Sequence, residues 1–153
     1  MSKTRVLFLC TGNSCRSQMA EGWLRHLAGD RFEAFSAGVE AHGLNPQAVA
    51  VMAEARVDLS GHTSDLLERY AETAIDYFIT VCDRAAESCP LTPPGSTTLH
   101  WSFDDPPAVV RAGGLAGEAA LAVYRRVRDQ IRDAVTAWIG SAPAVARRRG
   151  VSA

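Results

Sequence analysis

The sequence predicts an α/β fold built around a mostly parallel sheet. Stretches with strand composition alternate along the chain with stretches of helical spacing, which is typical of strand–helix–strand units. Residues 6–9 are continuously apolar, as expected for a strand covered on both faces. Residues 118–139 carry apolar side chains at steps of three and four, as expected for a long amphipathic helix.

The first half of the chain contains two predicted strand–helix pairs. Residues 5–9 form the first strand, and residues 17–28 follow with one apolar stripe at helical spacing. Residues 33–37 suit a second strand that ends at a glycine. A second helix is expected over residues 46–55, because Pro46 suits the first turn of a helix.

The second half repeats the alternation with shorter elements. Residues 62–70 predict a short helix that a threonine or serine would cap. Residues 75–81 have the highest β-branched and aromatic content of the chain and predict a third strand. Residues 91–95 contain prolines and a glycine and predict a loop before a fourth strand at 97–101. The long helix at 118–139 completes the fold.

Length and charge limit the classes of protein to consider. The 153 residues suit one domain, expected at 1–140, followed by a basic C-terminal tail at 141–153 that we expect to be frayed. A net charge of −1 gives no argument for a nucleic acid or membrane partner. No apolar run approaches the roughly 20 residues of a membrane span. We therefore expect a cytoplasmic monomer, in which cysteines serve catalysis or metal binding more often than structural disulfides.

Reactive side chains follow three predicted strands at the point where each strand ends. The run 10–17 contains two cysteines and an arginine, and the segment 82–89 begins and ends with cysteine. Asp104 and Asp105 follow the fourth strand. Because ligands bind outside the carboxyl ends of strands in an open α/β sheet, we expect these groups to converge.

The run 10–17 has the composition of an anion-binding loop. A small loop that enters a helix points backbone N–H groups inward, and Arg16 adds a planar fork for two oxygens of a tetrahedral anion. These donors should lower the pKa of Cys10 and favour its thiolate. Ser17 could cap the helix or hydrogen-bond Cys10. The predicted oxyanion-binding residues are Thr11, Gly12, Asn13, Ser14, Cys15, Arg16 and Ser17.

The residues from Val6 to Glu21, VLFLCTGNSCRSQMAE, resemble the signature of the low-molecular-weight tyrosine phosphatase superfamily. Within it, they are most similar to the thioredoxin-coupled arsenate reductases, and the resemblance extends from about residue 4 to 140. It implies a three-layer sandwich with a four-stranded parallel sheet flanked by helices.

The resemblance also implies roles for matching residues. Cys10 would attack arsenic, Arg16 would hold the oxyanion, and Asp105 would protonate the departing hydroxide. Cys82 would attack the Cys10 adduct, which releases arsenite and leaves a Cys10–Cys82 disulfide. Cys89 would then form a disulfide with Cys82, and thioredoxin would reduce it. The expected substrate is arsenate, with phosphate or sulfate as competing oxyanions, and no organic cofactor is needed.

The chemistry supports a relay on its own. Reduction of As(V) to As(III) takes two electrons. A single thiol cannot supply both electrons and then return to its reduced state, whereas extra thiols allow thiol–disulfide exchange. If the segment 82–89 is helical, its two cysteines have Cα atoms roughly 10 Å apart. A disulfide needs less than about 7 Å, so oxidation would have to unwind this segment.

The other polar candidates have simpler interpretations. Cys15 suits a small buried position before the helix, and the cysteine spacings match zinc sites poorly. Asp104 competes with Asp105 for the acid role, and either could be a turn residue. The histidines adjoin no motif, and surface or structural roles are expected for His26, His42, His62 and His100.

Some members of the reductase family bind a monovalent cation beside the anion loop. Four residues here match the positions used, and all offer oxygen ligands suited to potassium; alternatively, Glu21 is a solvated helix residue and Asp65 a cap. The matching residues are Asn13, Glu21, Ser36 and Asp65.

Two other functions compete with arsenate reduction. A tyrosine phosphatase would use Cys10, Arg16 and Asp105 through a phosphocysteine intermediate, but it would have no use for Cys82 and Cys89. In addition, the residues after Asp105 are prolines and an alanine and not the tyrosine pair typical of these phosphatases. Weak phosphatase side activity is compatible with the reductase. The other rival is a non-catalytic oxyanion or redox sensor.

Overall fold

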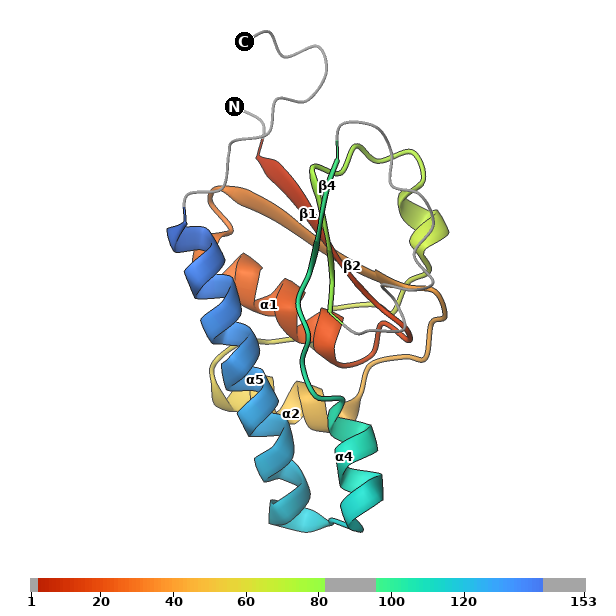
Figure 1. The fold of residues 1–153 in the computed structure, drawn as a ribbon, viewed down its shortest axis with the longest axis vertical. Helices are drawn as coiled ribbons and strands as arrows, with labels where there is room; N and C mark the ends of the chain where they lie inside the picture. The colour runs from red at the N-terminus through yellow and green to blue at the C-terminus, as the bar shows by residue number, and fades with distance from the viewer. Residues whose placement is uncertain (1–2, 82–95, 142–153) are drawn as a thin grey trace, which may run out of the picture.

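Four parallel strands form the centre of the fold, as predicted (Figure 1). Their spatial order is β2-β1-β3-β4, so the chain crosses over the sheet between consecutive parallel strands. The four apolar side chains at the centre of β1 are fully buried, which confirms a strand covered on both faces. The strands are β1 (Thr4–Cys10), β2 (Phe32–Gly38), β3 (Tyr77–Thr80) and β4 (Thr97–His100).

The computed structural model describes residues 3–81 and 96–141. The predicted loop at 91–95, the segment 82–89 and nearly all of the predicted tail at 141–153 lie outside these residues. In the described part of the chain, no helix is both long enough and apolar enough to span a membrane.

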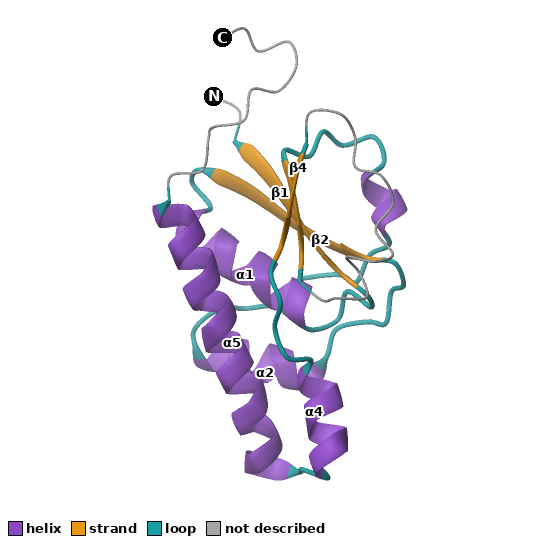
Figure 2. Ribbon diagram, in the orientation of Figure 1, coloured by secondary structure: helices purple, strands orange, loops and turns teal. Residues whose placement is uncertain are grey.

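Among the described residues, helices cover one face of the sheet and a short turn of 3-10 helix lies on the other. Helices α1 (Arg16–Ala28) and α5 (Gly117–Gly140) lie side by side (Figure 2). The centroid of the Trp138 ring of α5 lies 5.2 Å from that of the Phe32 ring of β2. Phe35 points to the opposite face because successive side chains alternate along a strand. There its ring contacts Tyr70 of η1 (Leu67–Tyr70) at 5.3 Å. The result is the three-layer α/β sandwich that we expected.

The predicted helices at 46–55 and 118–139 are confirmed as α2 (Pro46–Glu54) and α5. Asn45 caps α2, since its side-chain oxygen accepts hydrogen bonds from the first backbone N–H groups of the helix. The stripe predicted on α5 packs toward α1 and the sheet: Tyr124, Val127, Ile131 and Val135 are buried.

Two predictions about helices need correction. The predicted helix at 62–70 is wrong except for η1, because Leu66 pairs with Gly38 and extends the chain beside the end of β2. No side-chain hydrogen bond caps η1. Conversely, α4 (Pro106–Gly113) was not predicted. It begins with proline in its first turn and ends at a left-handed glycine, and both features are typical of helix ends. Its eight residues are too few to show a clear helical periodicity in the sequence.

Gly22 permits close packing of α1 against the segment after α2. A Cβ atom at this position would lie 2.7 Å from a methyl group of Leu59 and 3.1 Å from one of Val57. We therefore expect Gly22→Ala to overpack the core, even though alanine is the better helix former.

The predicted loss for Gly22→Ala is about 1–3 kcal/mol in the free energy of unfolding, seen as a Tm lower by roughly 3–10 °C. Gly140→Ala is the matched control, because a Cβ at the last residue of α5 meets no atom within 4 Å. Equal melting temperatures for Gly22→Ala and the unmodified protein would contradict this account of the packing.

Candidate active site

The loop between β1 and α1 has its carbonyl groups turned outward. Donors elsewhere bind them: backbone N–H groups of Glu40, His42 and Asn45 at 2.8–3.0 Å, the Gln18 amide at 3.1 Å, and the N–H of Met19 at 2.9 Å. Because C=O and the following N–H point in opposite directions in a planar trans peptide, the next amides face the inside of the loop. The carbonyls belong to Thr11, Gly12, Asn13, Ser14 and Cys15, so the inward amides are those of residues 12–16.

Asn13 holds the sharpest bend of this loop. Its φ of 49° is in the left-handed region, and successive N–H groups around such a residue form a concave anion-binding nest. Its side-chain oxygen accepts from the N–H of Asp65 at 2.7 Å, and its amide donates to Ser17 Oγ at 2.9 Å. Ser17 therefore accepts a hydrogen bond from Asn13 and does not cap α1, whose N-cap residue is Cys15 with no side-chain cap.

The end of β2 approaches the loop so closely that only glycine fits there. A Cβ on Gly38 would lie 2.4 Å from the carbonyl oxygen of Glu40, 2.8 Å from that of Thr11 and 2.9 Å from the Asn13 nitrogen. These are backbone atoms, which cannot move aside without distorting the loop. The glycine that marked the end of a strand in the sequence thus also sets the position of the anion loop.

Arg16 is anchored at the start of α1 with its side chain 11% exposed. One terminal nitrogen donates to the carbonyl of Phe103 at 3.0 Å, and the other lies 3.6 Å from Asp105 Oδ1. Its Nε is buried and has no hydrogen-bond partner among the described residues. A buried donor without a partner costs free energy, so this site favours an added acceptor.

The structure separates the two neighbouring aspartates. Asp105 faces Arg16, and although it is the N-cap residue of α4, its side chain caps nothing. Asp104 instead pairs with Arg126 of α5 at 3.1 Å and is 64% exposed. Only Asp105 therefore lies at the anion loop.

These groups line a cavity of about 480 Å³. Cys10, at the end of β1, and Arg16 lie in its wall beside Asp105, so the convergence predicted from the strand ends holds for these three. Asn13 and Ser17 are fully buried and support the loop from behind. The lining is Cys10, Thr11, Gly12, Ser14, Cys15, Arg16, His42, Asp105, Pro107 and Arg111.

Three lining residues were not predicted: His42, Pro107 and Arg111. His42 reaches the cavity because its backbone N–H binds the Gly12 carbonyl, a long-range contact without a local sequence signal. Arg111 is carried there by α4. If α4 had been predicted from its paired prolines and its closing glycines, Pro107 and Arg111 could have been identified as candidate lining residues.

Cys15 is buried, as expected, with 4% of its surface exposed. Burial raises the pKa of its thiol to about 12, and Asp105 adds to this effect while Arg16 opposes it. Cys15 is therefore a neutral thiol at physiological pH, although it contributes to the cavity wall. Cys82 and Cys89 lie outside the described residues.

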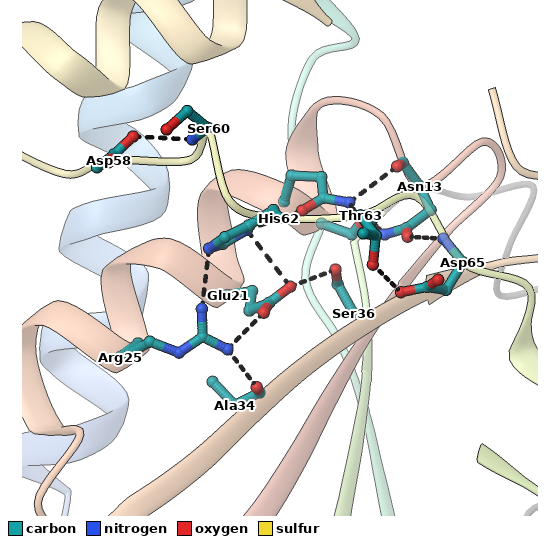
Figure 3. Close-up of polar contacts among 12 residues, drawn as sticks. Asn13, Glu21, Arg25, Ala34, Ser36, Asp58, Ser60, His62, Thr63 and Asp65 are labelled. Atoms are coloured by element: carbon teal, nitrogen blue, oxygen red, sulfur yellow. Dashed lines mark hydrogen bonds and ion pairs between the residues drawn. The ribbon is translucent and has the colours of Figure 1, made fainter. Parts of the chain in front are cut away.

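The four residues expected to bind a cation do lie close together behind the loop, but they bind one another and protein donors (Figure 3). Ser36 donates to Glu21 at 2.6 Å, and Arg25 donates to the other Glu21 oxygen. Beside them, burial lowers the pKa of His62, with Arg25 acting in the same direction and Glu21 against it. Within the described ranges, no three His, Cys, Asp or Glu side chains gather in a metal-binding cluster.

Comparison with known proteins places this site in a family. Residues 5–149 match the family model described as low molecular weight phosphotyrosine protein phosphatase. A protein from Bacillus licheniformis named arsenate reductase is 50% identical over 135 residues, which cover 88% of this chain and 94% of that protein.

Solved structures agree. A structure described as an arsenate reductase in the phosphate binding state superposes with a TM-score of 0.70 at 33% identity, covering 90% of this chain and 98% of that one. A Corynebacterium glutamicum protein described as a thioredoxin-dependent arsenate reductase gives 0.69 at 25% identity, covering 92% and 62%. The chain belongs to the low molecular weight phosphotyrosine protein phosphatase family and, within it, is similar to the proteins named arsenate reductase.

Proposed function

We propose that this protein reduces arsenate to arsenite at the loop that follows Cys10. The observation that carries the proposal is a buried cysteine beside inward-facing amides and an arginine whose buried N–H has no partner among the described residues. This donor set matches a tetrahedral oxyanion. The similarity over nearly the whole chain to a protein named arsenate reductase favours arsenate as the oxyanion.

In the proposed first step, the Cys10 thiolate displaces one hydroxide from arsenate. A sulfur–arsenic bond forms, an arsenic–oxygen bond breaks, and Asp105 gives the leaving hydroxide a proton, so that water departs. The loop amides and Arg16 bind the remaining oxygens. Asp105 suits the acid role because its carboxylate is next to Arg16, which would hold the anion.

In the second step, Cys82 attacks the Cys10 sulfur. A Cys10–Cys82 disulfide forms, and the electron pair of the sulfur–arsenic bond leaves with arsenic, which becomes As(III). One described contact supports an attack by Cys82 on Cys10, because it brings the residues next to them together. Val81, next to Cys82, donates its backbone N–H to the carbonyl of Leu9, next to Cys10, at 3.0 Å.

The proposed cycle closes when Cys89 attacks Cys82, frees Cys10 and leaves a Cys82–Cys89 disulfide. Thioredoxin then supplies two electrons and two protons and restores both thiols. Thiols therefore provide all the electrons, and no organic cofactor takes part.

The decisive experiment measures arsenate-dependent NADPH consumption with thioredoxin and thioredoxin reductase. We expect turnover by the unmodified protein, none by Cys82→Ser, and about one arsenite per protein from Cys89→Ser with Cys10–Cys82 trapped, because each variant stops the relay at a different thiol. Multiple turnovers by Cys89→Ser would contradict the order. If the protein fails to reduce arsenate but hydrolyses an aryl phosphate, and Cys82→Ser retains that hydrolysis, the protein is a phosphatase.

The neighbouring aspartates offer a matched test of the acid. Asp105→Asn should lower kcat about 10²–10⁴-fold, because the amide cannot protonate the leaving hydroxide. Asp104→Asn removes a carboxylate of the same size from an exposed pair with Arg126 and should change kcat less than about twofold. Equal losses in both variants would remove Asp105 from the acid role.

The two loop cysteines should differ in reactivity toward iodoacetamide. In a Cys82→Ser, Cys89→Ser protein at pH 8, we expect fast alkylation of Cys10 and very slow alkylation of Cys15. A pKa of about 12 leaves Cys15 with only about one part in ten thousand as thiolate at this pH. Peptide mass mapping identifies the modified residue. Comparable rates at both cysteines in the folded protein would contradict this difference.

A further inference from the structure

Behind the anion loop, the Arg25 guanidinium lies at one end of a polar cluster, next to Glu21 and His62 (Figure 3). One of its terminal nitrogens binds both Glu21 Oε2 at 2.5 Å and the carbonyl of Ala34 at 2.8 Å. The other lies 2.8 Å from His62 Nε2. Arg25 thus joins α1, β2 and the segment before η1 with three hydrogen bonds from one cationic group.

Three of the four expected potassium ligands already accept hydrogen bonds from the protein through their side-chain oxygens. The Glu21 oxygens accept from Ser36 and Arg25, and the Asn13 side-chain oxygen accepts from the N–H of Asp65. The two oxygens of Asp65 accept from Thr63 at 2.8 Å and from Arg69 at 3.0 Å. A bound cation would have to compete with these donors for the same oxygens.

The charges of the cluster are also balanced without an added ion. Two carboxylates, Glu21 and Asp65, face two guanidinium groups, Arg25 and Arg69. All four line one cavity of about 250 Å³. A potassium ion entering this cavity would meet two positive groups, and it would find no net negative charge to repay the loss of its water shell.

A directed chain of hydrogen bonds connects Arg25 to the anion loop. Because Arg25 is a donor, His62 Nε2 must accept, so His62 Nδ1 carries the proton and donates to Gln18 Oε1 at 2.9 Å. The Gln18 amide then donates to the carbonyls of Asn13 at 3.1 Å and Thr63 at 2.8 Å. The chain of hydrogen bonds ends at Asn13, the bend of the loop.

We infer that Arg25 is the resident cation of this cluster and a positioning residue for the anion loop, in place of a potassium ion. It fixes Glu21 directly, and through His62 and Gln18 it fixes the carbonyl of Asn13. That carbonyl must stay outward for the following amide to face the bound oxyanion.

The test compares potassium dependence in the full chain and three variants. Arg25→Met removes the charge at similar length, and Arg25→Lys keeps it. Arg132→Met is the matched control, an exposed arginine on α5 that pairs only with local aspartates. Each protein is measured in potassium, sodium and choline chloride at equal ionic strength. The readouts are Tm and the affinity for inorganic sulfate, neither of which needs arsenate turnover, so this inference and the proposed function can fail separately.

For the unmodified protein and for Arg132→Met, we expect the same Tm and sulfate affinity in all three salts. Arg25→Met should melt roughly 2–6 °C lower in choline and bind sulfate about tenfold more weakly. Potassium, but not choline, should restore part of both losses, because the carboxylates are now left without their cation. Arg25→Lys should keep most of the sulfate affinity.

Two results would overturn the inference. One is a potassium-specific rise in Tm or sulfate affinity in the unmodified protein, which would show that an ion already binds there. The other is an Arg25→Met protein that folds and binds sulfate as well as Arg132→Met does. If Arg25→Met does not fold, the comparison of salts on the unmodified protein and on Arg25→Lys still decides the question.

Discussion

The fold depends on outward hydrogen bonding of the carbonyl groups between Cys10 and Arg16. A short loop cannot turn its amides toward a ligand unless its carbonyls find partners elsewhere, since each buried, unpaired carbonyl costs about as much as a lost hydrogen bond. The partners come from the chain between β2 and α2, from the Gln18 side chain and from the backbone N–H of Met19 in α1. Much of the connection after β2 therefore serves to hold this loop open.

The sequence predicted those parts of the fold that follow from periodicity and composition. The buried strand β1 and the helix α5 show clear patterns, and both were located within a residue or two. The helix predicted over residues 62–66 is wrong. The residues of this segment suit a helix start, but pairing of Leu66 with Gly38 holds the segment extended. That pairing joins residues far apart in the chain, so no local pattern could have revealed it.

The candidate site divides in the same way. Cys10 ends β1 and Arg16 starts α1, so local patterns locate both, and the topology brings them together with Asp105. The choice of Asp105 over Asp104 came from the family resemblance. His42 and His62 carry no such signal. His42 is held at the loop by a backbone hydrogen bond, and His62 is linked to it by a hydrogen bond to Gln18. Both positions therefore depend on tertiary contacts. Arg25 looks like an ordinary solvent-facing helix residue until β2 is placed beside it.

Two helices begin at the same cavity, α1 at Arg16 and α4 just after Asp105. Each contributes the partial positive charge of its N-terminus, so the cavity attracts anions from two directions. For the proposed reaction, this has a consequence after the chemistry is finished. Arsenate is an anion near neutral pH, whereas arsenous acid is uncharged, so the same field that retains the substrate exerts no hold on the product. In the proposed reaction, reduction therefore weakens the electrostatic attraction that holds arsenic in the cavity.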